Sequence, residues 1–136
     1  STGDTRFVAA HLGRCYADGT IEFVACGQGP GFRLEPAGRR LLEETEPPLG
    51  VFFDQSFAVQ RLHLASGDML VLSTDGLVEC ESAGRQFGVE GVRTSLECSR
   101  ACRPGPLLDE VFREVERYQG AGTFRDDRCA LAIQRL

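Results

Sequence analysis

The sequence predicts an α+β fold, in which helices pack against an antiparallel β layer. Two observations support this prediction. Short apolar runs bounded by glycine and proline fill the first half of the chain, and runs with helical periodicity follow only in the second half. With 136 residues, the chain is long enough to bury a core of its own. We therefore expect a single domain over residues 1–136.

The first half of the chain has the pattern of two β-hairpins. The runs "RFVAAHLGRC" and "IEFVAC" flank Asp18-Gly19, a dipeptide typical of tight turns, so a hairpin is expected over residues 6–26. The runs "GFRLEP" and "GRRLLEE" lie around Pro36 and Gly38 and predict a second, shorter hairpin. The segment "ETEPPLGVFFDQS" that follows is rich in proline and glycine, which predicts a loop.

Strands continue to the middle of the chain and are then replaced by helices. The run "FAVQRLHLA" is strand-like, and "MLVLST" is short, apolar and continuous, as expected of a strand buried on both faces. The runs "VEGVRTSLECS" and "PLLDEVFREVERYQ" place apolar side chains on one helical face, and Pro104 and Pro106 fit the start of the second helix. In "DDRCALAIQRL" the alternation of Cys129, Leu131 and Ile133 predicts a closing strand.

The composition argues against two classes of partner. The formal net charge is -5 and lysine and arginine do not cluster, so the chain lacks the basic surface that nucleic acids require. No apolar run approaches the ~18 residues of a membrane span, and the first residues do not resemble a secretory signal. The six cysteines form no CxxC pair, which favours free, mostly buried thiols in a reducing cytoplasm over disulfides or a zinc site.

Acidic side chains stand at two strand ends that are far apart in the sequence. Asp75 follows the buried run "VLST" and precedes Gly76, a residue that can adopt positive φ; alone, this Asp-Gly pair is most simply a turn. Asp126 and Asp127 stand at the mouth of the closing strand. Adjacent strand residues point to opposite faces, so one of this pair is expected to share a cleft with Asp75. Oxygen ligands without a histidine or cysteine cluster favour Mg²⁺ or Mn²⁺ over zinc.

Around these residues the sequence resembles a known family. The stretch "LASGDMLVLSTDGLVECESAGRQFG" is similar to the C-terminal signature of SpoIIE-like serine/threonine phosphatases, a bacterial branch of the metal-dependent (PPM) protein phosphatases. Three further blocks agree in order and spacing: "DGTIEFVACGQGP", "PPLGVF" and "DDRCALAI". The resemblance covers nearly the whole chain. It implies a sandwich of two antiparallel β-sheets flanked by helices, with a two-metal centre at one end.

The resemblance also implies the site and the reaction. Asp75 and Asp126 correspond to catalytic metal ligands, and Gly76 belongs to the same metal-binding turn. The cofactor would be Mn²⁺ or Mg²⁺, and the reaction would be hydrolysis of phosphoserine or phosphothreonine on a regulatory protein, such as an anti-sigma-factor antagonist, by a metal-activated water. An upstream sensory domain is a further implied feature. The alternative is a catalytically inactive phosphatase-like module for binding or signalling.

Two features depart from the family pattern. The family's first metal motif, an Asp with a Gly-His-Gly-type segment, does not occur in the 136 residues, so we expect the C-terminal portion of a phosphatase domain without its N-terminal strands. Gln28 stands where the family often has histidine, and we interpret "GQGPGF" as a structural turn. Glu79 is either an exposed carboxylate that caps the loop or an outer partner of the metals. Asp68 is expected to close a turn.

A first prediction follows from the missing motif. Residues 1–136 alone should hydrolyse p-nitrophenyl phosphate negligibly, even with excess Mn²⁺, because the acid that usually bridges both metals is absent from them. The release of p-nitrophenolate measures this directly. Robust Mn²⁺-dependent turnover by these residues would show that the missing motif has been assigned wrongly.

Overall fold

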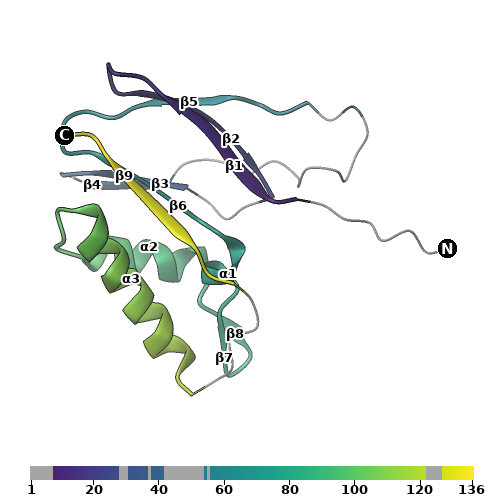
Figure 1. Ribbon diagram of the computed structural model, residues 1–136. Coiled ribbons are helices and arrows are strands. Elements are labelled where there is room, and N and C mark those ends of the chain that lie inside the picture. The colour runs from purple at the N-terminus through teal and green to yellow at the C-terminus, as the bar shows by residue number, and fades with distance from the viewer. Residues whose placement is uncertain (1–7, 28–30, 37, 42–53, 55, 122–126) are drawn as a thin grey trace. The chain divides into compact units, whose positions relative to one another are not determined.

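The structure is a computed structural model that describes residues 8–27, 31–36, 38–41, 54, 56–121 and 127–136 (Figure 1). Its elements follow one another along the chain as β1 (Ala10–Cys15), β2 (Thr20–Cys26), β3 (Gly31–Glu35), β4 (Gly38–Leu41), β5 (Gln60–His63), β6 (Met69–Ser73), α1 (Asp75–Val78), β7 (Glu81–Ser82), β8 (Arg85–Gln86), α2 (Gly88–Cys98), α3 (Pro104–Gln119) and β9 (Ala130–Gln134). Every strand pair among the described residues is antiparallel, which confirms the predicted class.

The described residues fall into two compact units, each with its own sheet. The first unit draws on residues 1–28 and 44–63, and its sheet has the strand order β1-β2-β5. The second unit comprises residues 29–43 and 64–136, and its sheet has the strand order β4-β3-β6-β9. The same unit contains the separate two-stranded hairpin β7-β8, which lies between α1 and α2 in the chain. Both predicted hairpins are confirmed, since β1 pairs with β2 and β3 pairs with β4.

The turn between β1 and β2 forms at the predicted dipeptide. Gly19 has φ of 93°, a conformation that favours glycine, and the Asp18 carboxylate accepts a hydrogen bond of 2.8 Å from the Thr20 backbone N–H. The backbone N–H of Tyr16 closes the loop on the Thr20 carbonyl at 2.8 Å. Strand β5 is shorter than the predicted run "FAVQRLHLA", because only Gln60–His63 pairs with β2.

An exposed ion pair joins β2 to β5 in the first unit. Glu22 lies opposite Arg61 in the strand register, and its carboxylate accepts a hydrogen bond from that guanidinium. The Tyr16 hydroxyl donates a second bond to Glu22, at 2.9 Å. The Arg61 hydrogen bond, followed by that from Tyr16, lowers the pKa of the Glu22 carboxyl, and the same contact raises the pKa of Arg61. The pair therefore favours one register between the two strands.

Strand β6 is the central strand of the second unit. All five of its residues are buried, as predicted for the run "MLVLST". It pairs with β3 on one side and β9 on the other, so that Val71 lies opposite Phe32 in β3 and Ala132 in β9. The predicted loop "ETEPPLGVFFDQS" falls almost entirely outside the described residues.

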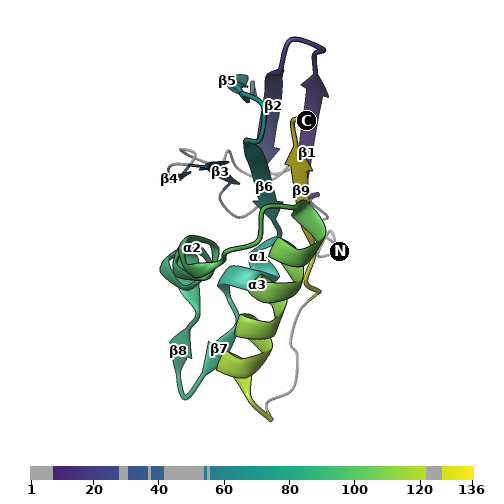
Figure 2. The same ribbon diagram turned by 90° about the vertical axis from the view of Figure 1, so that its left-hand side faces the viewer.

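Helices α2 and α3 cover one face of this sheet (Figures 1 and 2), as predicted. Helix α3 begins at Pro104 rather than Pro106, so both prolines lie in its first turn, where a missing N–H costs nothing. The core between sheet and helices is apolar. Its buried members are Phe32, Leu34, Met69, Val71, Leu77, Cys80, Val92, Leu96, Leu107, Val111 and Val115.

Strand β9 packs its alanine side chains on this core. Ala130 and Ala132 pack against the helices, whereas Leu131 is 53% exposed. Alanine side chains are small, so they leave room for close packing between the strand and the helices. The closing strand predicted from the alternation is therefore confirmed.

The cysteines also differ from expectation. All six are free thiols, but only Cys26 and Cys80 are buried, so the expectation of mostly buried thiols was wrong. Cys98 is the last residue of α2 and Cys102 lies beyond the helix, where neither is covered. Among the described residues, no helix is long and apolar enough to cross a membrane.

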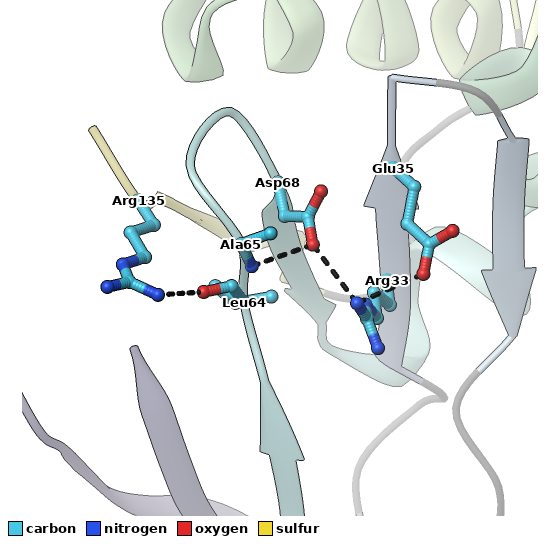
Figure 3. Close-up of polar contacts among 6 residues, drawn as sticks. All are labelled: Arg33, Glu35, Leu64, Ala65, Asp68 and Arg135. Carbon is cyan, nitrogen blue, oxygen red and sulfur yellow. Dashed lines mark hydrogen bonds and ion pairs between the residues drawn. The ribbon is translucent and has the colours of Figure 1, made fainter. Parts of the chain in front are cut away.

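The turn that precedes β6 is held by a buried carboxylate (Figure 3). Asp68 is 3% exposed and accepts hydrogen bonds from the Ala65 backbone N–H at 2.9 Å and from the Arg33 guanidinium at 3.1 Å. The predicted turn-closing role of Asp68 is confirmed. Arg135, beyond β9, donates from its side chain to the Leu64 carbonyl at 2.7 Å and from its backbone to the Asp68 carbonyl at 3.0 Å. The start of β6 is thereby anchored to both neighbouring strands.

We expect Asp68→Ala to lower the free energy of unfolding by about 2–3 kcal/mol, because the Arg33 guanidinium and the Ala65 N–H both lose a buried acceptor. Glu35→Ala is the matched control, since Glu35 contacts the same guanidinium at 3.0 Å from a side chain that is 35% exposed. Its loss should be about 0–1 kcal/mol. Urea denaturation followed by circular dichroism measures both, and equal losses would contradict the anchoring role of Asp68.

Candidate metal centre

The chain leaves β6 directly into the segment that carries Asp75. Thr74 is extended, with φ of -78° and ψ of 161°, and Asp75 is the first residue of the one-turn helix α1. Taken alone, the Asp-Gly pair is most simply a turn, but Gly76 lies inside this helical turn. The Asp75 side chain is half-buried, whereas Gly76 and Leu77 behind it are buried.

Gly76 is required by a close contact and not by its φ angle. A Cβ atom placed on Gly76 would lie 2.2 Å from the carbonyl oxygen of Asp127 and 3.0 Å from its carbonyl carbon. These are backbone atoms, which cannot rotate away as the tip of a side chain can. Glycine therefore lets the segment before β9 approach the backbone of the helical turn that carries Asp75.

Thr74 joins the same two segments by hydrogen bonds. Its backbone N–H donates to the Cys129 carbonyl at 2.9 Å, and its side-chain hydroxyl accepts from the Cys129 N–H at 3.0 Å. The hydroxyl also lies 3.4 Å from the Asp127 carbonyl and 3.3 Å from the Cys129 carbonyl, so its single proton has an acceptor. The two strand ends predicted to carry a joint site, at residue 75 and just before β9, are therefore adjacent.

The site residues predicted from the sequence have different outcomes. Asp75 and Gly76 lie at the junction just described, and both Asp75 and Asp127 engage in polar or electrostatic contacts. Asp126 and Gln28 lie outside the described residues, so the expectation that Asp75 and Asp126 share a cation cluster stays a prediction. Glu79 is exposed at the end of α1.

The residues at this junction fit one side of a site for a hard cation. Asp75 presents a carboxylate from the end of a buried strand, and Gly76 leaves its turn open to close approach of the other acidic segment. Oxygen donors of this kind suit Mg²⁺ or Mn²⁺. In the part of the chain that the structure describes, no three histidine, cysteine or acidic side chains gather closely enough to hold a metal ion, so further donors would have to come from elsewhere.

Sequence reasoning missed two residues that shape this junction. Thr74 was given no role, and its hydroxyl bonds to the segment before β9 rather than capping α1. Arg128 was not considered at all. Its guanidinium donates to the Gln119 side-chain carbonyl and lies 3.6 Å from the Cys80 sulfur. The sequence signal that could have identified it is its position, directly after the acidic pair and directly before the closing strand.

The sequence matches the family described as Stage II sporulation protein E (SpoIIE) over residues 1–136. The chain belongs to the SpoIIE family. The resemblance found in the sequence motifs is thereby confirmed. Among curated relatives, Protein IcfG of Synechocystis sp. is 24% identical over 121 residues, which are 88% of this chain and 19% of that protein.

Solved structures show the same fold. The phosphatase domain of the cell fate determinant SpoIIE from Bacillus subtilis, presoaked with manganese, matches 93% of this chain with a TM-score of 0.75 at 17% identity, and 56% of that chain is covered. The RsbU and RsbW domains of Rv1364c from Mycobacterium tuberculosis match 98% of this chain with a TM-score of 0.69 at 20% identity, and 38% of that chain is covered. This SpoIIE-family chain therefore has the fold of a PP2C phosphatase domain, and it spans about half or less of these relatives.

We expect Gly76→Ala to lower the free energy of unfolding by about 2–3 kcal/mol, because the added methyl group must displace the Asp127 backbone. Gly105→Ala, in the first turn of α3, is the control: nothing lies within 4 Å of its added Cβ, so alanine should be neutral or stabilise by up to about 1 kcal/mol. Thermal and urea denaturation measure both variants. A Gly76→Ala variant as stable as the parent would show that the two segments do not touch.

Proposed function

We propose that this chain is part of a metal-dependent protein phosphatase that hydrolyses phosphoserine or phosphothreonine on a regulatory protein. The observation that carries the proposal is the contact of the Asp75–Gly76 turn with the backbone of Asp127. It brings two acidic segments to one end of the paired strands β6 and β9. Membership of the SpoIIE family and the PP2C fold support the same reaction class.

In this proposal each residue at the junction has a distinct task. Asp75 and Asp126 supply the negative charge that holds divalent cations, and Gly76 belongs to the same binding turn. Mn²⁺ or Mg²⁺ bound there would supply a water of lowered pKa and positive charge for the phosphoryl oxygens. Thr74 keeps the two acidic segments in register through its bonds to Cys129. Asp127, the neighbour of Asp126 in the chain, has no metal-binding task in this proposal.

The substrate class rests on the relatives. The Rv1364c structure combines an RsbU domain with an RsbW domain, and the Bacillus subtilis protein is described as a cell fate determinant. We infer a regulatory phosphoprotein as the substrate, such as an anti-sigma-factor antagonist, and an upstream sensory domain in the whole protein. The six free thiols suit a reducing cytoplasm. Manganese is the first metal to test, because a manganese-soaked relative shares the fold.

The test is the rate of phosphatase activity against Mn²⁺ concentration in the full-length protein. Asp75→Asn and Asp126→Asn keep the side-chain shape but remove the charge that holds the ions, so turnover should fall at least about 100-fold while circular dichroism stays unchanged. Asp127→Asn should stay within about tenfold of the parent. Asp109→Asn, at an exposed position of α3, is the matched control and should have no effect.

Near-parental rates and Mn²⁺ dependence in both Asp75→Asn and Asp126→Asn would contradict the two-metal site. The same chain would then act as a phosphatase-like module for binding or signalling. An equal collapse in Asp127→Asn would instead show that both members of the acidic pair face the ions.

A further inference from the structure

Arg128 packs against the Asp75–Gly76 turn, where the two acidic segments meet. It follows Asp127, whose carbonyl packs on Gly76, and its own Cγ atom is 3.4 Å from the place that a Cβ of Gly76 would occupy. The aliphatic part of Arg128 therefore rests on the start of α1. From there its guanidinium reaches Gln119 and Cys80, two residues with little solvent exposure.

The guanidinium contacts two further elements. It donates a hydrogen bond to the side-chain carbonyl of Gln119, the last residue of α3, and lies 3.6 Å from the sulfur of Cys80, which follows α1. Gln119 is 9% exposed and Cys80 is 4% exposed, so both contacts are shielded from solvent. One side chain thereby connects the segment before β9, the end of α1 and the end of α3.

Helix α3 is a rigid anchor for this contact. Leu107 and Val115 on its inner face are fully buried against the sheet, and the Val115 carbonyl lies 3.9 Å from the Cys80 sulfur. A charge-assisted bond from a guanidinium to a buried amide is stronger and more directional than a bond between neutral groups. The position of the Asp127 backbone is therefore coupled to α3 through Arg128.

We propose that Arg128 is a positioning residue that sets how closely the acidic segment before β9 approaches the Asp75 turn, and thereby sets the affinity of the site for divalent cations. The inference rests on the proposed function, because it presupposes cations at that junction. Residues that orient metal ligands through hydrogen bonds commonly change metal affinity about 10- to 100-fold when replaced.

The sign of the effect separates positioning from two simpler roles. A positive charge near a cation site repels the ion, so if Arg128 acted only through its charge, Arg128→Met would tighten Mn²⁺ binding. If Arg128 only stabilised the fold, the variant would unfold at a lower temperature with an unchanged dissociation constant for Mn²⁺. Positioning alone predicts that Mn²⁺ binds more weakly after the positive charge is removed.

The experiment measures the Mn²⁺ dissociation constant of the full-length protein by calorimetry, at a temperature where circular dichroism shows each variant folded. Arg128→Met should raise the constant about 10- to 100-fold. Gln119→Leu leaves the arginine charge in place but removes its anchor on α3, so it should also raise the constant. The double variant should lose little more than either single variant, because the two residues act through one contact.

Arg117→Met is the matched control, because Arg117 lies on the exposed side of α3 and pairs with Glu114 one turn away. Arg117→Met should leave the Mn²⁺ dissociation constant unchanged.

If Arg128→Met does not fold, Gln119→Leu tests the same contact from the helix side. Suppose that Asp75→Asn abolishes Mn²⁺ binding, but Gln119→Leu and Arg128→Met bind Mn²⁺ as tightly as the parent or more tightly. That result overturns the proposed role of Arg128 and leaves the proposed function standing. Mn²⁺ binding that survives Asp75→Asn overturns the proposed function and this inference together.

Discussion

The contact between Gly76 and the carbonyl of Asp127 is the constraint on which the site depends. A backbone oxygen that lies 2.2 Å from the position of a missing Cβ leaves no freedom for any side chain at residue 76. The same contact determines where the chain enters β9, and thus where the acidic pair before that strand can lie. Two further interactions support the Gly76–Asp127 contact. Thr74 forms paired hydrogen bonds with Cys129, and Arg128 donates a hydrogen bond to Gln119.

The surrounding unit keeps this contact in place through strand β6. One end of β6 is anchored by the buried Asp68, which bonds to Arg33 in β3, and by Arg135 beyond β9 (Figure 3). The other end runs into the Asp75 turn. Because β6 is buried along its whole length and paired on both sides, a displacement at one end is resisted by the whole sheet. A carboxylate placed at the end of such a strand is held in a defined position, as metal binding requires.

Much of the second unit could be predicted from sequence patterns. The apolar runs around Pro36 and Gly38, the continuous apolar run of β6 and the helical spacing in α2 and α3 are local patterns, and the structure has each of these elements. The errors arose where a distant segment decides the outcome. The pair Asp75-Gly76 has the composition of a turn, yet it lies in a helical turn. In β9, Ala130 and Ala132 pack against the helices and Leu131 is exposed, which the alternation alone does not indicate.

The sequence by itself determined which acidic residues are candidates for the site and which family the chain belongs to. It supplied an acid after a buried strand, an acidic pair before the last strand, and motif blocks typical of SpoIIE-like phosphatases in the right order, all of which are local patterns of residue type and spacing. Only the tertiary structure decided that these segments touch, that Gly76 is needed for space and not for its φ angle, and that Arg128 connects them to α3. The physical reason is that contacts between residues far apart in the chain depend on strand register and on the volume left between packed elements, and neither is encoded in a local pattern.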